Sequence, residues 1–83
     1  MTTAMTEQQT AVTVYSQPNC QPCRITKRAL DKREITYTEV DITKDDVAAE
    51  YVRSLGHMQA PVVVTSEGEH WSGYRPDKLG ELA

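Results

Sequence analysis

Two cysteines separated by two residues are the side chains of this sequence that best suit chemistry. Cys20 and Cys23 are the only cysteines among the 83 residues, and their spacing allows the two sulfurs to close a small, reversible disulfide ring. A disulfide across so short a loop removes little entropy from the unfolded chain, so stabilisation is a poor reason for the pair. The spacing therefore indicates a redox-active dithiol.

Thiol–disulfide exchange would give the two cysteines different roles, because one thiolate attacks a substrate disulfide and a second thiol resolves the mixed disulfide. Pro22 suits the first turn of a helix, where its missing N–H costs nothing. The positive end of that helix would lower the pKa of Cys20 well below the ~8.5 of a free thiol. We expect Cys20 to be the more exposed nucleophile and Cys23 the more buried resolving thiol.

Metal binding is the alternative use of such a cysteine pair. Structural zinc needs four ligands, and only His57 and His70, which are far apart in the chain, could complete the set. Copper-chaperone-like domains also carry two cysteines between a strand and a helix, but they usually have methionine where this chain has Pro18. We therefore expect no metal site, and a soft-metal-binding module remains a remote alternative.

Composition and length favour one small domain that binds neither nucleic acid nor membrane. Nine basic and twelve acidic side chains give a net charge of -3, whereas phosphate binding relies on a surplus of Lys and Arg. No stretch approaches the ~20 apolar residues of a membrane span, and residues 1–10 lack the features of a secretory signal. We expect a cytoplasmic monomer with a flexible tail over residues 1–10 and one domain over residues 11–83.

Local patterns place the dithiol between a strand and a helix. A β-branched run predicts a strand over residues 11–16, and the helix that begins at the dithiol extends to Lys32. Alternation predicts a second strand over residues 36–42. A second helix follows, with Thr43 as its expected cap, Gly56 as its end, and one apolar face made of Val47, Tyr51, Val52 and Leu55.

The rest of the chain predicts a hairpin and a final helix. A continuous apolar strand covers residues 61–65, a turn residues 66–68, and a short return strand residues 69–71; the last helix covers residues 78–83. The order βαβαββα, with the dithiol after the first strand, resembles the thioredoxin fold. That resemblance implies an α/β fold with a four-stranded mixed sheet and helices on both faces.

The Ala60-Pro61 pair gains a role from the same resemblance. In the thioredoxin superfamily the matching proline follows a cis peptide bond that faces the dithiol, and the backbone before it pairs with an extended substrate strand. A cis bond at this position would be a specific feature of the fold, because only a few per cent of X–Pro bonds are cis in folded proteins. We therefore expect Ala60 and Pro61 to present the partner.

Two further stretches distinguish among the redoxins. Gln17 stands where glutaredoxins have a basic residue for glutathione, and residues 71–77 read Trp-Ser-Gly-Tyr-Arg-Pro-Asp. This segment resembles the Trp-Ser-Gly-Phe-Arg-Pro signature of NrdH-type redoxins. The resemblance implies that hydrogen bonds of Arg75 rigidify the region where glutathione would otherwise bind, and that Trp71 offers a partner a flat apolar surface. The alternatives are a solvated surface charge for Arg75 and a core or hairpin-packing role for Trp71. The implied partner-binding residues are Gln21, Pro22, Ala60, Pro61, Trp71, Ser72, Gly73, Tyr74 and Arg75.

The resemblance to this family implies an electron carrier without a bound organic cofactor. Electrons would come from NADPH through thioredoxin reductase, and the substrate would be the large subunit of class Ib ribonucleotide reductase. A glutathione-dependent glutaredoxin is the alternative. Pro22 precedes the second cysteine as in thioredoxin, so we expect a reduction potential near thioredoxin's about -270 mV rather than the glutaredoxin range of about -200 to -230 mV.

The first helix also carries an excess of positive charge. Only Asp31 opposes its cations, which are Arg24, Lys27, Arg28, Lys32 and Arg33. This pattern is typical of a solvated helix face, and the alternative is the docking of an acidic partner, because opposite potentials speed encounter.

Overall fold

The computed structural model describes residues 11–82, and the strand β1 (Val12–Ser16) runs through the centre of its sheet. Every second side chain of β1, at Val12, Val14 and Ser16, is buried on one face of the sheet, as β-strand alternation requires. The predicted flexible tail, residues 1–10, and Ala83 lie outside the described residues.

The sheet has four strands in the order β2-β1-β3-β4. β2 (Tyr37–Asp41) pairs parallel with β1, β3 (Val62–Thr65) pairs antiparallel with β1, and β4 (His70–Ser72) pairs antiparallel with β3. The mixed four-stranded sheet that the thioredoxin resemblance implied is therefore confirmed. The antiparallel register pairs Tyr15 with Val62, which brings the end of β1 beside the start of β3.

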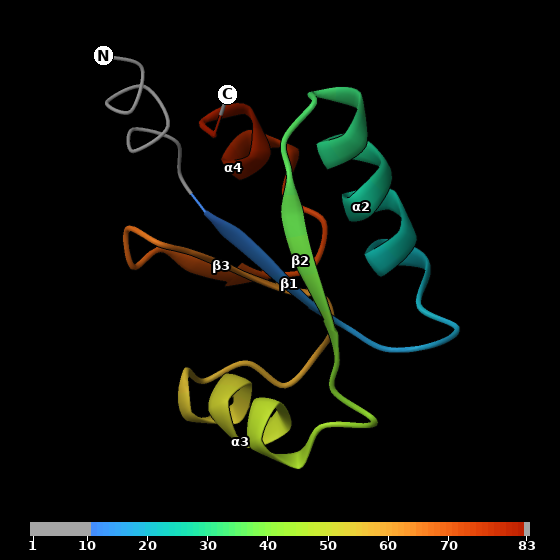
Figure 1. Cartoon of the computed structure of the whole chain (residues 1–83), viewed down its shortest axis with the longest axis vertical. Coiled ribbons are helices and arrows are strands. Elements are labelled where there is room, and N and C mark those ends of the chain that lie inside the picture. The colour runs from blue at the N-terminus through green and yellow to red at the C-terminus, as the bar shows by residue number, and fades with distance from the viewer. Residues whose placement is uncertain (1–10, 83) are drawn as a thin grey trace.

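One face of the sheet is covered by α2 (Gln21–Lys32) and α4 (Pro76–Gly80), which pack beside each other in Figure 1. Leu30 of α2 and Leu79 of α4 have no exposed surface. They pack in one cluster with four sheet side chains, namely Val12, Val14, Val63 and Trp71. Burial of these side chains is the principal stabilisation of the domain, because apolar area removed from water is the main favourable term in folding.

The other face of the sheet carries α3 (Asp46–Ser54), so that helices cover both faces (Figure 1). Ala48 and Val52 are the buried side chains of α3. The expected apolar face of this helix is therefore partly wrong: Val47 is 80% exposed and Tyr51 41% exposed. The ring of Tyr51 nevertheless contacts Tyr15 of β1, with ring centroids 5.7 Å apart.

The cap of α3 also differs from the expected one. Asp45 is the N-cap residue, and its Oδ1 accepts a hydrogen bond of 3.0 Å from the N–H of Ala48. The expected cap, Thr43, instead donates from its backbone N–H and its hydroxyl to Asp41 Oδ1, at 2.9 Å and 2.6 Å. Thr43 therefore belongs to a turn after β2, and the helix starts later than predicted.

Other boundaries differ from prediction by one to three residues, the largest difference being the end of the last helix at Gly80 rather than at residue 83. The last helix begins at Pro76 rather than at residue 78, because a proline in the first turn has no N–H to leave unpaired. The return strand covers residues 70–72 rather than 69–71. Within residues 11–82, no helix has the length and apolar character that crossing a membrane demands.

Candidate functional site

The loop from β1 to α2 places the first cysteine at the start of a helix. Asn19 has a φ of 57°, a left-handed conformation that Asn tolerates better than most residues, and it turns the chain into the helix. Cys20 then occupies the N-cap position, with Pro22 in the first turn as predicted. The N–H of Cys23 donates to Cys20 Sγ over 3.1 Å. This contact, at the positive end of α2, favours negative charge on that sulfur.

The two cysteines are joined by a disulfide, with their Cα atoms 5.2 Å apart. Cys20 is 7% exposed and Cys23 is 1% exposed. The order of exposure is the predicted one, although Cys20 is itself largely covered. An attacking or leaving sulfur is thus accessible from the Cys20 side.

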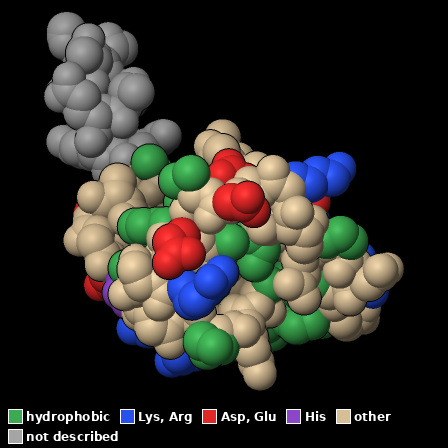
Figure 2. Space-filling model, turned by 90° about the horizontal axis from the view of Figure 1, so that it is seen from below, with side chains coloured by type: hydrophobic (Ala, Val, Ile, Leu, Met, Phe, Trp, Pro, Cys, Tyr) green, Lys and Arg blue, Asp and Glu red, His purple; other side chains and the backbone are tan. Residues whose placement is uncertain are grey.

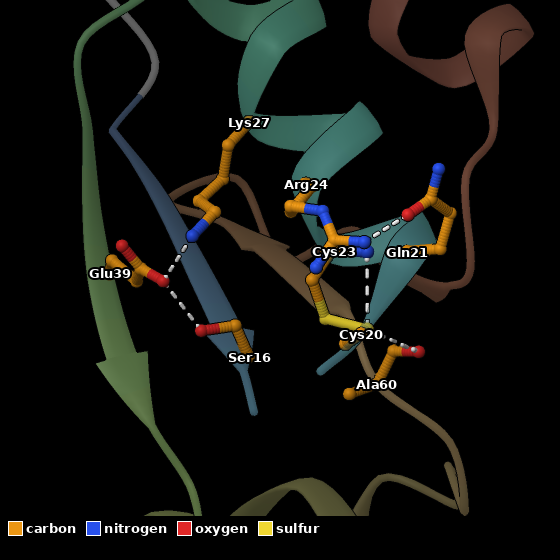
Figure 3. Close-up of a disulfide and its surroundings, with 8 residues drawn as sticks. All are labelled: Ser16, Cys20, Gln21, Cys23, Arg24, Lys27, Glu39 and Ala60. Atoms are coloured by element: carbon orange, nitrogen blue, oxygen red, sulfur yellow. Dashed lines mark hydrogen bonds and ion pairs between the residues drawn. A yellow bond between two sulfur atoms is a disulfide. The ribbon is translucent and has the colours of Figure 1, made fainter. Parts of the chain in front are cut away.

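Ala60 and Pro61 face the dithiol, and the peptide bond between them is cis, as predicted. The carbonyl oxygen of Ala60 lies 3.8 Å from Cys20 Sγ (Figure 3). These segments meet because the dithiol follows the end of β1 and Pro61 precedes β3, and these two strand ends are adjacent in the sheet. The site therefore follows from the sheet topology.

Segment 71–75 is joined to Pro61 by a backbone hydrogen bond. The N–H of Gly73, at a φ of 82° that glycine adopts without strain, donates to the carbonyl oxygen of Pro61 over 2.8 Å. Arg75 makes a two-pronged contact with Asp77, from Nε to Oδ1 at 3.1 Å and from Nη2 to Oδ2 at 2.9 Å. The hydrogen bonds of Arg75 therefore fix its own loop, next to the start of α4.

Trp71 lies in the core rather than at the partner surface. Its side chain is 4% exposed and belongs to the cluster under α2 and α4. The expectation that Trp71 offers a partner a flat apolar surface is therefore wrong, because strand alternation turns this side chain inward, opposite Val63. Ser72 and Gly73 are half-buried, and Tyr74 is 40% exposed, so Tyr74 is the accessible aromatic ring of the segment.

Gln21 and Pro22 are exposed beside the disulfide. The amide oxygen of Gln21 accepts a hydrogen bond from the guanidinium of Arg24, one turn later in the same helix (Figure 3). This contact extends across the first turn of α2, on the exposed surface beside the disulfide.

A charged network beside the dithiol was not predicted from the sequence. Glu39 Oε2 accepts a hydrogen bond of 2.7 Å from the hydroxyl of Ser16 and lies 2.7 Å from Lys27 Nζ (Figure 3). The bond from Lys27, and then that from Ser16, lowers the pKa of Glu39. These three side chains line a polar cavity of about 240 Å³ together with both cysteines.

The network joins side chains of β1, α2 and β2. Of these three, only Lys27 has a sequence spacing from the dithiol that indicates its place in the site. Lys27 follows Cys23 by one helical turn, which places both on one side of α2. Glu39 reaches the same place only because β2 pairs parallel with β1 in a register that sets it opposite Val14. No local pattern specifies that register.

The two histidines that were weighed as zinc ligands contact each other. His57 Nε2 and His70 Nδ1 are 2.8 Å apart, and the rings meet edge to face. Within residues 11–82, no group of three or more His, Cys, Asp or Glu side chains is arranged to hold a metal ion. The pair joins the segment after α3 to the start of β4.

Comparison with known proteins agrees with this geometry. The family model described as glutaredoxin matches residues 12–71. The "Gene 56 protein" of Mycobacterium phage D29 is 40% identical over 74 residues, which cover 88% of this chain and 82% of the phage protein. The glutaredoxin-like protein NrdH of Lactococcus lactis subsp. cremoris is 39% identical over 72 residues, covering 87% of this chain and 99% of the relative.

A solved structure gives the same relationship in three dimensions. The NrdH-redoxin from Escherichia coli, a protein described as having a thioredoxin-like activity profile, superimposes with a TM-score of 0.84 at 34% identity. The match covers 88% of this chain and 95% of that protein. The chain therefore belongs to the glutaredoxin family of the thioredoxin superfamily, and within it to the glutaredoxin-like NrdH redoxins.

Proposed function

We propose that this protein is a dithiol electron carrier that reduces protein disulfides, with class Ib ribonucleotide reductase as its substrate and NADPH-dependent thioredoxin reductase as its reductant. The observation that carries the proposal is the Cys20–Cys23 disulfide at the start of α2, facing the cis Ala60-Pro61 bond. This arrangement gives an extended partner strand a place to lie beside an attackable sulfur. The proposed working compartment is the cytoplasm.

The proposed reaction moves two electrons in two exchange steps. The thiolate of Cys20 attacks one sulfur of the substrate disulfide, so that a mixed disulfide forms and the other substrate sulfur leaves as a thiolate. The Cys23 thiol, after losing its proton, then attacks Cys20 Sγ and releases the second substrate sulfur. The substrate gains two electrons and two protons, and the carrier is left with the Cys20–Cys23 disulfide, which the reductase reduces again.

The choice of thioredoxin reductase over glutathione rests on two features. Gln17, which is exposed, replaces the basic residue that glutaredoxins use for glutathione. The N–H of Gly73 ties the 71–77 segment to the carbonyl oxygen of Pro61, and Arg75 bonds to Asp77 within the same segment instead of remaining free for a glutathione carboxylate. The relatives named NrdH support the same choice by similarity.

Two reducing systems, compared on the oxidised protein, test the proposal. One contains NADPH with thioredoxin reductase, and the other contains NADPH, glutathione and glutathione reductase. We expect NADPH consumption and the appearance of free thiols with the first system, with at most slow reduction by the second. Turnover of class Ib ribonucleotide reductase should then require the carrier.

Reduction by the glutathione system alone would overturn the assignment in favour of a glutathione-dependent glutaredoxin. Failure of both systems, together with stoichiometric binding of a soft metal ion, would overturn the carrier proposal as a whole. The double variant Cys20→Ser/Cys23→Ser is the matched control, because it removes the dithiol and keeps side chains of similar size.

A further inference from the structure

An open groove lies along α2, outside the dithiol site. It has a volume of about 510 Å³ and is lined by side chains of α2, by Arg33 at its end, and by Tyr74 of the loop after β4, the whole set being Ile25, Arg28, Ala29, Lys32, Arg33 and Tyr74. Three of these are cations and none is acidic. The groove therefore combines positive charge with a small apolar floor.

The cations of this groove have no acidic partner in the part of the chain that the structure describes. The three ion pairs within residues 11–82 involve Lys27, Arg53 and Arg75, and not Arg28, Lys32 or Arg33. The other cations of α2 are engaged elsewhere, Lys27 with Glu39 and Arg24 with Gln21. Positive charge is thus left available on the groove side of the helix, although the whole chain carries a net charge of -3.

Acidic side chains gather on other faces of the molecule. Asp31, the acidic residue of α2, lines a different hollow that it shares with Glu34 and Glu39. Figure 2 views the side on which α3 lies, where acidic, basic and apolar side chains are interspersed. α3 itself carries Asp46 in its first turn, and Glu50 lies 3.6 Å from Arg53. The groove along α2 therefore has an unopposed positive charge that the α3 face lacks.

The groove adjoins the segment that holds the cis-proline. Tyr74 follows Gly73, whose N–H is bonded to the carbonyl oxygen of Pro61. Ile25 lies one helical turn after Gln21, the exposed residue that follows Cys20, and on the same side of α2. A chain that passes the dithiol can thus continue into the groove, with an apolar side chain near Ile25 and Tyr74 and its carboxylates near Arg28 and Lys32.

We propose that this groove binds an acidic, extended segment of the partner protein, next in sequence to the disulfide that Cys20 attacks. The inference rests on the proposed carrier function, which it deepens by assigning the recognition chemistry of the substrate: Glu or Asp side chains with one aliphatic or aromatic anchor. Charge complementarity of this kind speeds encounter and selects partners.

Two synthetic peptides separate this inference from the carrier function. Both carry serine in place of the two substrate cysteines, so that binding is measured without exchange. One has a glutamate-rich arm with a leucine, and the other has glutamine at the glutamate positions. Because one exposed ion pair contributes at most about fivefold in affinity, the groove pairs together predict roughly tenfold tighter binding of the acidic peptide. Fluorescence anisotropy at low salt reports the two dissociation constants.

The variant Arg28→Gln/Lys32→Gln should remove this preference, and its matched control is Lys44→Gln/Arg53→Gln, which deletes two charges on and before α3. The preference should also vanish at about 1 M salt, where the screening length is about 3 Å. Equal affinity for both peptides, or equal loss in both variants, would refute the groove assignment. Reduction of a small disulfide by the pre-reduced variants reports the carrier function separately, and we expect it unchanged in both.

Discussion

At the level of single residues, the two sulfurs differ in exposure, which fits the different roles that they have in the proposed exchange reaction. Cys20 is the sulfur that a substrate can reach, and Cys23 is almost fully covered. In Cys23→Ser the first exchange step remains, but nothing resolves its product. We therefore expect this variant to accumulate a mixed disulfide with its substrate, which a non-reducing gel and intact-mass measurement detect.

The reciprocal variant provides the control. Cys20→Ser keeps Cys23 and its free thiol, so a simple count of thiols is the same in both variants. We expect no adduct with Cys20→Ser, because the remaining sulfur is 1% exposed. Adducts of equal yield from both variants would contradict the assigned roles.

A buried hydroxyl in α2 leads to a prediction about stability. Thr26 has no exposed surface, and its Oγ1 has no hydrogen-bond partner within residues 11–82. An unsatisfied buried polar group costs about 1–3 kcal/mol, whereas valine has nearly the same shape without the hydroxyl. Thr26→Val should therefore raise the free energy of unfolding by about 1 kcal/mol.

Urea unfolding of the oxidised protein measures this change through its midpoint. Thr13→Val is a suitable control, because Thr13 is only partly buried on β1 and is not among the unsatisfied groups. A lower midpoint for Thr26→Val than for the parent would show that the hydroxyl is satisfied in solution.

At the scale of elements, the start of α3 depends on one capping side chain. Asp45 accepts the N–H of Ala48, whereas Thr43 bonds only to the turn after β2. Loss of an N-cap costs about 1 kcal/mol, and surface changes elsewhere stay within about 0.5 kcal/mol. Asp45→Ala should therefore destabilise the protein more than Thr43→Ala, as measured by thermal or urea unfolding. The reverse order would restore Thr43 as the cap.

This pair of residues also indicates how far local sequence patterns reach. Thr43 and Asp45 both suit a cap, and the choice depends on Asp41, which engages Thr43 in the preceding turn. The helix after the dithiol was easier to predict, because Pro22 suits its first turn, and Thr26 and Leu30, four residues apart, mark its buried face. The order of elements and the cis Ala60-Pro61 bond were also predictable, the latter by resemblance alone.

Contacts between elements were the part that the sequence did not reveal. Trp71 was expected at the surface because the neighbouring loop residues belong to a family signature, yet the pairing of β4 with β3 turns it into the core. The Glu39 network likewise depends on the register between β1 and β2. The place of Glu39 depends on long-range strand pairing, which no local pattern specifies, whereas the burial of Trp71 also agrees with the alternation of exposed and buried side chains along β4.

At the scale of the whole molecule, the sheet brings distant segments to one end. β1 leads into the dithiol, β3 starts beside it after Pro61, and β2 ends beside it at Asp41. The segment between α3 and Pro61 is held to β4 by the contact between His57 and His70. This contact therefore links the stability of the loop before Pro61 to the protonation of His57.

That link predicts a dependence of folding stability on pH. Desolvation, and then the neighbouring His70, lower the pKa of His57 below its ordinary 6.5. The folded state thus binds fewer protons than the unfolded chain, so the contribution is complete above about pH 6.5 and is lost as the pH falls through that value toward the lower folded pKa. The pair is exposed to solvent, so we expect a loss of about 0.5 kcal/mol, the low end for one hydrogen bond.

Urea unfolding midpoints of the oxidised protein, measured between about pH 3 and pH 8, test this expectation against His57→Gln, which removes the titrating group. Arg53, which lines the same hollow as His57, keeps its charge throughout this range and so does not contribute to the slope.

Glu39 contributes to stability in a separate pH range. Lys27 and then Ser16 lower the pKa of Glu39 below its ordinary 4.5, so stability is lost below that pH as the carboxylate takes up a proton. The parent should therefore lose stability in the upper window and His57→Gln should not, whereas both should lose it in the lower one. Parallel curves for the two proteins above pH 5 would show that the histidine contact contributes nothing to folding.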